Sequence, residues 1–478
     1  MKKSITKNYI YNLIYQILAT IVPLITTPYL SRVLGAEKIG IYSYTLSITT
    51  YFILLGSLGV STYGQREIAY VRDDAKLRTR TFIEILIMRT ITLTISMIIF
   101  YFTFAISGEY SMYYKILLLE IIANIVDISW FFQGQEEFKK TVMRNIIVKI
   151  ISVVCIFIFV KTQEDLSKYF LIYVLSTLLG NLSLWMYLPK YVEKINFKKL
   201  RILRHLRPTI ELFIPQIAVQ IYTVLDKTMI GAMVEDKSEV GFYEQAQKIV
   251  KLMVTISTSL GAVMVPRMAN TYAIGDKDKL KEYMYKSFQF TLLIAFPLMF
   301  GIISVASKFV PIFYGNGYDK VAILINIISP IILAIGLSSV TGTQYLVPTN
   351  QQKKYTISVT LGAIVNFCLN SILIKVLKAT GASIATVIAE FSVTGIQFYL
   401  LRNEINISDV IKIAKNYFIA SVLMFIISCI IGLIIPIPIL SIVIQIVLGA
   451  ITYFATLIIL KDEFIGIGMD KIKSKFSR

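Results

Sequence analysis

Histidine, cysteine and charge are all scarce in this chain of 478 residues. It has one histidine, three cysteines and 16 % charged residues, against roughly 25 % in ordinary soluble domains. These numbers leave little means for a zinc site or a Ser-His-Asp triad, so we expect no metal, no cofactor and no catalytic residue. Cys155, Cys368 and Cys429 lie in apolar runs and are expected to pack as small hydrophobes. His205 lies in a basic stretch and is expected to be a solvated loop residue.

Apolar residues are abundant instead. They make up 56 % of the chain, and the mean hydropathy is +0.70. Such a chain cannot cover a water-facing surface, so the composition predicts an all-α polytopic membrane protein. The first apolar run begins near Tyr9 and continues to Leu30 without a small-residue cleavage site, so we interpret it as a membrane span and not as a signal peptide.

Fourteen apolar segments are long enough to cross a bilayer as helices, which takes about 20 residues each. They lie near 8–31, 39–64, 82–107, 115–133, 141–160, 168–189, 209–233, 240–266, 284–307, 320–347, 355–374, 381–401, 414–435 and 439–460. The last two are separated at Ile435–Pro438, because two prolines in four residues favour a turn over a helix interior.

The net charge is +19, and the positive residues are divided unevenly between the two sides of these spans. With both termini inside, 32 of the 48 lysines and arginines fall on the inner side, ten on the outer side and six within spans. This asymmetry predicts a multi-pass protein of the bacterial cytoplasmic membrane with both termini in the cytoplasm, and it needs no nucleic-acid partner.

A weak internal repeat divides the chain. An offset of 201 residues aligns spans 1 and 2 with spans 7 and 8, and it places Gly40 on Gly241 and Arg66 on Arg267. We predict two parallel six-helix lobes around a central cavity: an N-lobe over 1–189, a basic linker over 190–208 and a C-lobe over 209–401. Residues 402–478 add spans 13 and 14 and a basic tail. Whether the linker lies on the inner leaflet or is simply a solvated loop is open.

Polar side chains form stripes along spans 1, 7 and 8. The stripes contain Asn8, Asn12, Gln16, Thr20 and Thr27; Gln216, Gln220, Thr223, Asp226 and Lys227; and Glu244, Lys248, Lys251, Thr255 and Ser259. Spacing of three to four residues places such groups on one helix face. We expect them to line a hydrated cavity between the lobes, although hydrogen bonds within a closed bundle are the alternative. Two lysines on one face need an anion or water.

Further charges lie inside other spans. Glu84 and Arg89 lie in span 3, Glu120 and Asp127 in span 4, Arg144 and Lys149 in span 5, and Glu390 in span 12. Each costs roughly 2.5–3.5 kcal/mol at mid-depth, so each needs a partner or a function. Structural ion pairs among the first-lobe charges are one interpretation, and Arg144 is expected to reach the interface from near its span end. Glu390 is either an ion-coupling site or a protonated acid.

Two motifs resemble those of a known transporter family. Residues 31–42, Ser-Arg-Val-Leu-Gly-Ala-Glu-Lys-Ile-Gly-Ile-Tyr, and residues 226–231, Asp-Lys-Thr-Met-Ile-Gly, are similar to motifs of Wzx-type polysaccharide flippases. The second is followed by Val240-Gly-Phe-Tyr243 and Val265-Pro-Arg267. These flippases belong to the multidrug/oligosaccharidyl-lipid/polysaccharide exporter (MOP) superfamily. The resemblance runs along nearly the whole chain and implies two six-helix lobes in a V, alternating access, and an undecaprenyl-pyrophosphate-linked oligosaccharide as cargo. It gives cavity or gate roles to Arg32, Arg66, Asp226, Lys227 and Arg267.

The leading hypothesis is therefore a transporter, and not an enzyme, that moves lipid-linked repeat units for O-antigen or capsule biosynthesis. The expected substrate-binding residues are Arg32, Arg66, Arg89, Lys149, Lys227, Lys248, Lys251 and Arg267, with Asp226, Glu84 and Glu390 as ion-coupling acids. Whether H⁺ or Na⁺ drives transport is open, as is partnership with a polymerase and glycosyltransferases. A cation-coupled multidrug exporter and a lipid II flippase are the alternatives. A membrane glycosyltransferase or polymerase is disfavoured because the loops reach only about 20 residues.

Overall fold

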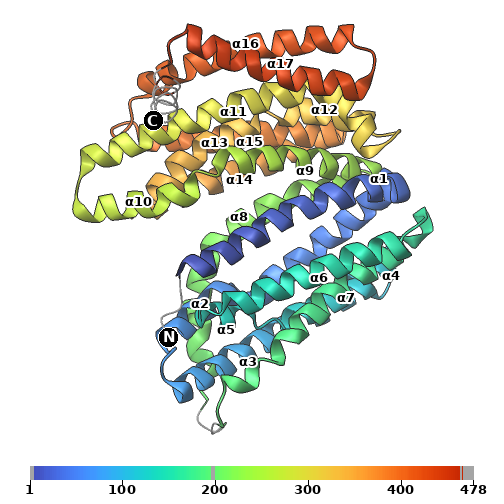
Figure 1. Ribbon diagram of the computed structural model, residues 1–478. Coiled ribbons are helices and arrows are strands. Elements are labelled where there is room, and N and C mark those ends of the chain that lie inside the picture. Colours follow the sequence, from blue (N-terminus) through green and yellow to red (C-terminus); the bar gives the residue numbers. More distant parts are fainter. Residues whose placement is uncertain (1–4, 195–196, 198–199, 463, 465, 467–478) are drawn as a thin grey trace. The chain divides into compact units, whose positions relative to one another are not determined.

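The computed structural model describes residues 5–194, 197, 200–462, 464 and 466, without the side chains of 5–20, 214–216 and 218–222. Regular structure in these residues is helical throughout, which confirms the all-α prediction (Figure 1). The polar-stripe residues Asn8, Asn12, Gln16, Thr20, Gln216 and Gln220 lie outside the described side chains.

Twelve helical segments within the described residues are long and apolar enough to cross a membrane, so the prediction of a multi-pass membrane protein is confirmed. The first of them, Ile21–Tyr70, has 50 residues. As one straight helix these residues would rise about 75 Å, more than twice the hydrocarbon thickness of a bilayer.

The chain clusters into two compact units. Unit 1 comprises Met1–Gly231 and Asp236–Val240, and unit 2 comprises Ala232–Glu235 and Gly241–Arg478. The predicted lobe boundaries stay a prediction.

Unit 1 contains eight α-helices among its described residues. They are α1 (Ile5–Ser57), α2 (Val60–Tyr70), α3 (Ala75–Phe100), α4 (Ser111–Ile125), α5 (Ser129–Gly134), α6 (Phe138–Phe159), α7 (Leu166–Trp185) and most of α8 (Leu206–Met233). Short turns η1 (Tyr101–Ala105), η2 (Gln163–Asp165), η3 (Leu188–Lys190) and η5 (Ile202–His205) connect or extend them.

Three breaks shape the helices of unit 1. Gly35 lies inside α1 with φ 76° and ψ 169°, which no helix accommodates, so α1 consists of two helices joined there. Leu58 (φ 47°) and Gly59 (φ 75°) separate α1 from α2. Residues 126–128 separate α4 from α5 and include Asp127, whose carboxylate accepts from the Ser129 amide at 2.9 Å.

Helix α8 packs on α1 within unit 1. The Thr228 and Ser47 hydroxyls lie 2.8 Å apart. Gly231 lies flat against the Tyr44 ring, and a Cβ there would come within 2.0 Å of the ring. This close approach explains why the Asp226–Gly231 motif ends in glycine. Gly59, which precedes α2, also lies against Phe213, near the start of α8.

Unit 2 contains nine further α-helices in the described part of the chain. They are α9 (Ser238–Thr258, most of it in this unit), α10 (Gly261–Ile274), α11 (Lys277–Tyr314), α12 (Asp319–Ile328), α13 (Ile331–Ser338), α14 (Gln352–Leu377), α15 (Ala379–Leu400), α16 (Ile407–Ile434) and α17 (Pro438–Ile459). A π-helical turn, η6 (Ser339–Leu346), follows α13.

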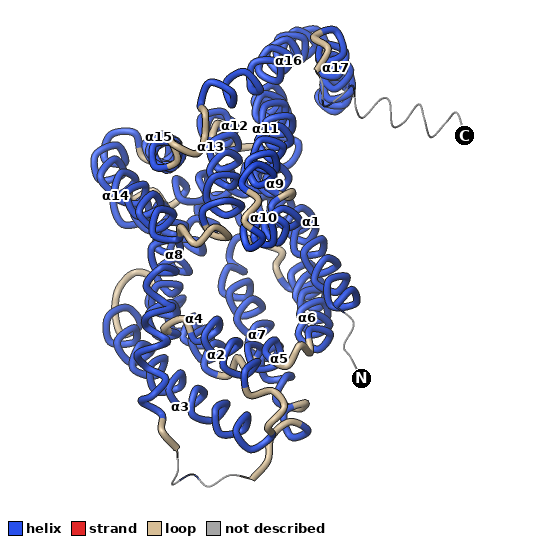
Figure 2. Tube along the Cα trace, turned by 90° about the vertical axis from the view of Figure 1, so that its left-hand side faces the viewer, coloured by secondary structure: helices blue, strands red, loops and turns tan. Residues whose placement is uncertain are grey.

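The last two helices form a hairpin, with α16 and α17 side by side (Figure 2). Helix α16 ends at Ile434 and α17 begins at Pro438, so the break predicted at the two prolines is confirmed. The Lys308 ammonium of α11 holds this turn, since it donates to the Ile435 carbonyl at 2.6 Å and the Ser441 hydroxyl at 2.8 Å. The basic tail lies largely outside the described residues.

Candidate functional site

The eleven predicted site residues fall in both units. Unit 1 holds Arg32, Arg66, Glu84, Arg89, Lys149, Asp226 and Lys227, and unit 2 holds Lys248, Lys251, Arg267 and Glu390. Their roles stay predictions. The structure does show the surroundings of each, and these surroundings differ sharply.

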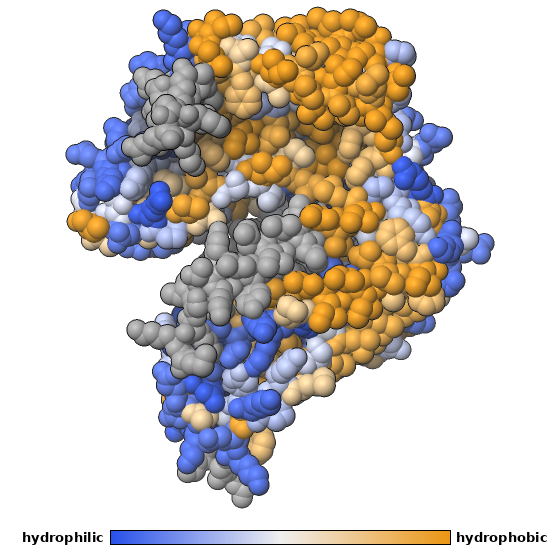
Figure 3. Space-filling model, viewed as in Figure 1, coloured by the Kyte–Doolittle hydropathy of each residue, from blue (hydrophilic) through white to orange (hydrophobic). Residues whose placement is uncertain are grey.

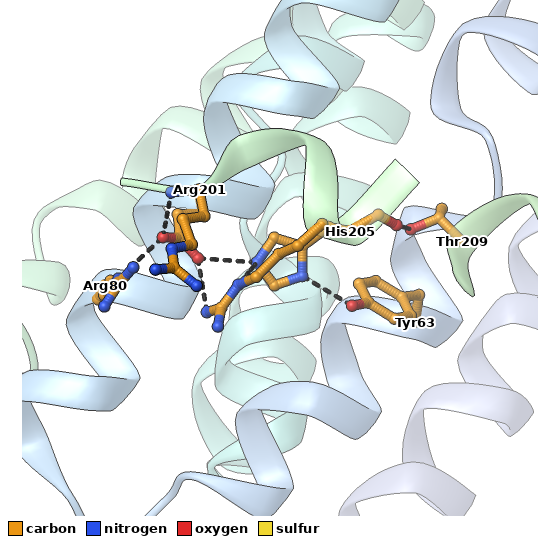
Figure 4. Close-up of polar contacts among 7 residues, drawn as sticks. Tyr63, Arg80, Arg201, His205 and Thr209 are labelled. Atoms are coloured by element: carbon orange, nitrogen blue, oxygen red, sulfur yellow. Dashed lines mark hydrogen bonds and ion pairs between the residues drawn. The ribbon is translucent and has the colours of Figure 1, made fainter. Parts of the chain in front are cut away.

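A buried polar cluster lies between α3 and η5, and Figure 4 labels Arg80, Arg201 and His205 among its members. Glu84 joins them through its carboxylate. Its side chain is fully buried, and its Oε1 accepts from Arg80 Nε at 2.9 Å and from the Arg201 amide at 2.7 Å. Its Oε2 lies 2.6 Å from Arg204 Nη2 and 2.9 Å from His205 Nε2. Four donors surround one carboxylate, so the cluster satisfies a charge that burial alone would make very costly.

The prediction that His205 is a solvated loop residue is wrong. Its exposed fraction is 2 %, because the chain folds η5 back onto α3. Its Nε2 lies 2.9 Å from Glu84 Oε2 and 3.2 Å from Arg204 Nε, and its Nδ1 lies 2.7 Å from the Tyr63 hydroxyl. Burial lowers the pKa of His205, and the bond to Glu84 opposes this shift. The ring is therefore neutral at pH 7.

The same surface of α3 holds the preceding part of the linker. Arg78 Nη2 donates to the Tyr191 carbonyl at 2.8 Å, and the Glu193 amide donates to the Thr79 hydroxyl at 3.0 Å. With the Glu84 cluster, these contacts fix the chain before α8 onto α3. Glu84 thus has an anchoring role that sequence reasoning missed, because three of its four partners lie more than 100 residues away.

Arg89 lies one turn farther along α3 in a very different environment. Its side chain is 1 % exposed, and its Nη2 lies 3.7 Å from Asp127 Oδ2. This contact confirms one of the structural ion pairs expected from the sequence. Its Nε and Nη1 have no hydrogen-bond partner within the described residues. A buried guanidinium with a single long ion pair is poorly compensated.

Lys149 lines a polar pocket of about 350 Å³ between α6 and α7, which we call the α6–α7 pocket. Its lining residues are Arg144, Asn145, Val148, Lys149 and Ser152 from α6, and Tyr173, Ser176, Thr177, Gly180 and Asn181 from α7. The volume lies within the range of small-molecule sites, roughly 300–1,000 Å³.

Arg144 belongs to this pocket, which corrects the expectation that it only reaches the interface. Its Nη1 donates to Asn181 Oδ1, and Asn181 Nδ2 in turn donates to the Ala123 carbonyl of α4 at 2.7 Å. Gly180 permits the close approach of the helices, since a Cβ there would lie 2.9 Å from the Val148 side chain. The polar residues Tyr173, Thr177 and Asn181, which recur at a spacing of four, are a sequence signal that could have indicated this site but was not used.

The α6–α7 pocket combines groups suited to an anionic, hydroxylated ligand. Arg144 offers a planar fork and Lys149 a point charge, both of which bind phosphate or carboxylate oxygens. Amide and hydroxyl groups from both helices offer the bonds that sugars use. Tyr173 connects the pocket to an aromatic cluster on its other side, where its ring centroid lies 5.8 Å from that of Tyr42.

The remaining predicted cations of unit 1 lie outside this pocket lining. Arg32 is exposed on α1. Arg66 pairs with Glu67 at 3.0 Å and stacks on the Tyr63 and Tyr70 rings. Asp226 is buried, while Lys227 beside it is half-buried.

In unit 2, Lys248 lies 3.7 Å from Glu244 one turn earlier on α9. Lys251 and Arg267 are exposed, and Glu390 is half-buried on α15. Sequence reasoning missed a buried polar chain beside these charges. Gln247 Nε2 donates to Tyr243 Oη at 2.7 Å, and that hydroxyl lies 2.9 Å from Thr386 Oγ1.

The chain is similar to known membrane transport proteins. A family model described as "Polysaccharide biosynthesis protein" matches residues 5–272, and one described as MatE matches 212–372. A protein named "Putative O-antigen transporter" from Escherichia coli K12 is 25 % identical over 84 % of this chain and 98 % of its own length. "Lipid II flippase MurJ" of Bacillus subtilis is 25 % identical over 39 % of this chain and 34 % of its own.

A solved structure shares the fold. "Lipid II flippase MurJ, inward closed conformation" superposes with a TM-score of 0.78 at 16 % identity and covers 96 % of this chain and 100 % of that one. The first family model matches more than half of the chain, and the predicted resemblance is confirmed. The chain therefore belongs to the polysaccharide biosynthesis protein family, within the MOP superfamily of membrane transporters.

Proposed function

We propose that this protein is a flippase that moves undecaprenyl-pyrophosphate-linked oligosaccharides from the inner to the outer leaflet of the bacterial cytoplasmic membrane. The products serve O-antigen or capsule biosynthesis. The observation that carries the proposal is the similarity to the Escherichia coli protein named as an O-antigen transporter, which extends over 98 % of that protein.

The α6–α7 pocket supports a cargo with a phosphate head and a sugar body. Arg144 and Lys149 suit the pyrophosphate, and the side chains of Asn145, Thr177 and Asn181 suit sugar hydroxyls. A purely apolar drug offers these two side chains no oxygen atoms to bind, so the pocket favours a saccharide cargo over a multidrug exporter.

Fourteen spans with both termini in the cytoplasm are the proposed topology. The break at Gly35 gives α1 enough length for two crossings, and the 28 residues of α8 suffice for one more beyond the twelve segments. The excess of lysine and arginine on the proposed inner side sets the orientation. Cysteine labelling from each side of the membrane at Lys2 and Lys461 tests it, and opposite accessibilities of the two positions would contradict it.

Transport proceeds by alternating access in this proposal, with Asp226, Glu84 and Glu390 as candidate coupling acids. Glu84 has four donors that hold its carboxylate in place, which argues against ion coupling at Glu84. Rates measured under imposed H⁺ and Na⁺ gradients decide whether either ion is coupled. Pull-down of a polymerase and glycosyltransferases tests the proposed partners.

The direct test is transport of defined lipids by purified protein in liposomes. We expect undecaprenyl-pyrophosphate-linked oligosaccharide to cross several-fold faster than in protein-free vesicles. A second candidate cargo, lipid II, is favoured by the TM-score of 0.78 to a lipid II flippase. Faster transport of lipid II than of any oligosaccharide lipid would replace the first cargo by the second, and transport of neither would refute the proposal.

A further inference from the structure

A second hollow lies between the same two helices as the α6–α7 pocket. It is an apolar groove of about 410 Å³, which we call the α6–α7 groove. Its lining residues are Val148, Ile151, Cys155 and Phe159 from α6, and Lys168, Leu171, Ile172, Leu175, Ser176 and Leu179 from α7. Lys168, the one charged residue among them, is paired with Asp165 at 2.6 Å.

The groove and the pocket lie on opposite flanks of the contact between α6 and α7. Along α7, Leu175 and Leu179 line the groove, whereas Tyr173, Thr177 and Asn181 line the pocket. A helix turns by 100° per residue, so these two stripes face in different directions. The groove side carries exposed apolar side chains, with Ile151 at 55 % and Leu179 at 62 %. Figure 3 shows hydrophobic surface over α6. The groove therefore opens toward lipid.

Val148 and Ser176 are the two residues that line both hollows. Each is half-buried, and each comes from a different helix. They form the partition between the polar pocket and the lipid-facing groove. Neither side chain is large, so the partition is thin at this level.

We propose that the α6–α7 contact is a lateral opening through which the polyprenyl chain of the cargo reaches the bilayer while its pyrophosphate head occupies the α6–α7 pocket. This inference rests on the proposed function. A lipid-linked saccharide has a head that lipid excludes and a tail that a polar pocket excludes. Two hollows of opposite character, separated by Val148 and Ser176, match these two parts.

The depth of the cations favours a cargo in transit over a resident phospholipid. Lys149 is the twelfth residue of the 22-residue α6, so it lies about 16 Å from either helix end. Phospholipid headgroups remain at the membrane surface, whereas the head of a lipid that is being flipped must pass the middle of the bilayer. The charge and its depth together identify the occupant as the phosphate-headed cargo.

The test places a larger side chain in the partition, once from α6 and once from α7. In proteoliposomes, Ser176→Phe and Val148→Phe are each expected to slow the flipping of a fluorescent undecaprenyl-pyrophosphate-linked oligosaccharide at least tenfold. Ile150→Phe is the matched control, because Ile150 is 49 % exposed and lines neither hollow. It should flip at the wild-type rate. Thermal unfolding of each variant verifies that it is folded.

A second measurement separates the opening from the head site. Binding of a water-soluble pyrophosphate-linked oligosaccharide without the polyprenyl chain should fall far less in the two Phe variants than the flipping rate does, because Val148 and Ser176 border the pocket without supplying its charges. Wild-type flipping by both folded variants would overturn the inference, as would an equal loss of head binding. Absence of flipping by the wild-type protein would instead refute the proposed function.

Crosslinking keeps the test decisive even if the Phe variants do not fold. A cargo analogue with a photoreactive group on its polyprenyl chain should label wild-type peptides that contain α6 and α7. Labelling confined to peptides from other helices would overturn the inference.

Discussion

Glu84 and Arg89 both lie on α3 and are both buried, but their charges are opposite and so are their surroundings. Glu84 has four donors within 2.9 Å. Arg89 has one ion pair at 3.7 Å and two nitrogens without a hydrogen-bond partner within the described residues. Burial inside a span therefore does not by itself distinguish an anchoring charge from a poorly compensated one.

The cations of the α6–α7 pocket have surroundings of a third kind. Arg144 and Lys149 border a volume of about 350 Å³ instead of a closed cluster. A ligand can reach a charge of this kind without breaking the packing of the unit. The comparison predicts that loss of Glu84 costs stability, loss of the pocket cations costs transport, and loss of Arg89 costs little.

Glu84→Gln should have the largest effect. The amide presents its own donor to groups that already donate, and it removes the charge that balances Arg80 and Arg204. We expect the free energy of unfolding to fall by about 3 kcal/mol, measured by thermal or denaturant unfolding in detergent. The control is Glu211→Gln, since Glu211 is exposed and pairs with exposed Arg207. Unfolding of Glu84→Gln at the wild-type temperature would contradict the anchoring role.

Arg144→Gln and Lys149→Gln should each slow transport without a matching loss of stability. A hydrogen bond to a charged group contributes about 1.5–3 kcal/mol, which corresponds to roughly 10- to 100-fold in rate when the bond forms only with cargo. Flipping rates in proteoliposomes and unfolding temperatures are measured on the same samples. Lys139→Gln serves as the control, because Lys139 is exposed on α6 and lines neither the pocket nor the groove. Equal rates in all three variants would remove the pocket from the mechanism.

Arg89→Met should leave the free energy of unfolding within about 1 kcal/mol of the wild type or raise it. A buried ion pair replaced by an apolar side chain of similar length is often neutral or stabilising. Asp127→Asn should cost more, because it leaves the guanidinium buried without its carboxylate. The account fails here if Arg89→Met is the more destabilising of the two.

His205 should give the smallest effect, and it depends on pH. Because burial lowers the pKa of His205 in the folded protein, the unfolded chain binds more protons below pH 6.5. Its contribution to stability is complete above pH 6.5 and is lost as the pH falls toward the lowered pKa. The unfolding temperature of the wild type should therefore drop more between pH 7.5 and 5.5 than that of His205→Gln. Parallel curves would contradict the neutral, buried ring.

Local sequence patterns predicted most of the fold. The length of the apolar runs located the helices, and the prolines at 436 and 438 located the turn between α16 and α17. The break expected between the spans at 8–31 and 39–64 is found at Gly35. The packing of α8 within unit 1 was not predictable in this way, because it depends on contacts such as Gly231 against Tyr44, which join residues 187 positions apart.

The site was predictable only in part, for a related reason. Lys149 was identified because a lysine deep in a span is costly. Arg144 was underrated because its position near a span end gave no sign of Asn181 on the next helix. The prediction for His205 was wrong because the positive charge of the surrounding segment suggested that it lies in solvent. The contact between His205 and buried Glu84 instead holds that segment inside the unit. Long-range partners, not residue types, decide these cases.

The most direct test of the central claim compares Lys149→Gln with the wild type in liposomes that contain undecaprenyl-pyrophosphate-linked oligosaccharide. We expect the wild type to flip this lipid and the folded variant to flip it at least tenfold more slowly. Wild-type protein that leaves the lipid in its original leaflet, or a variant that moves it at an unchanged rate, would exclude a role for Lys149 in the flipping of this cargo.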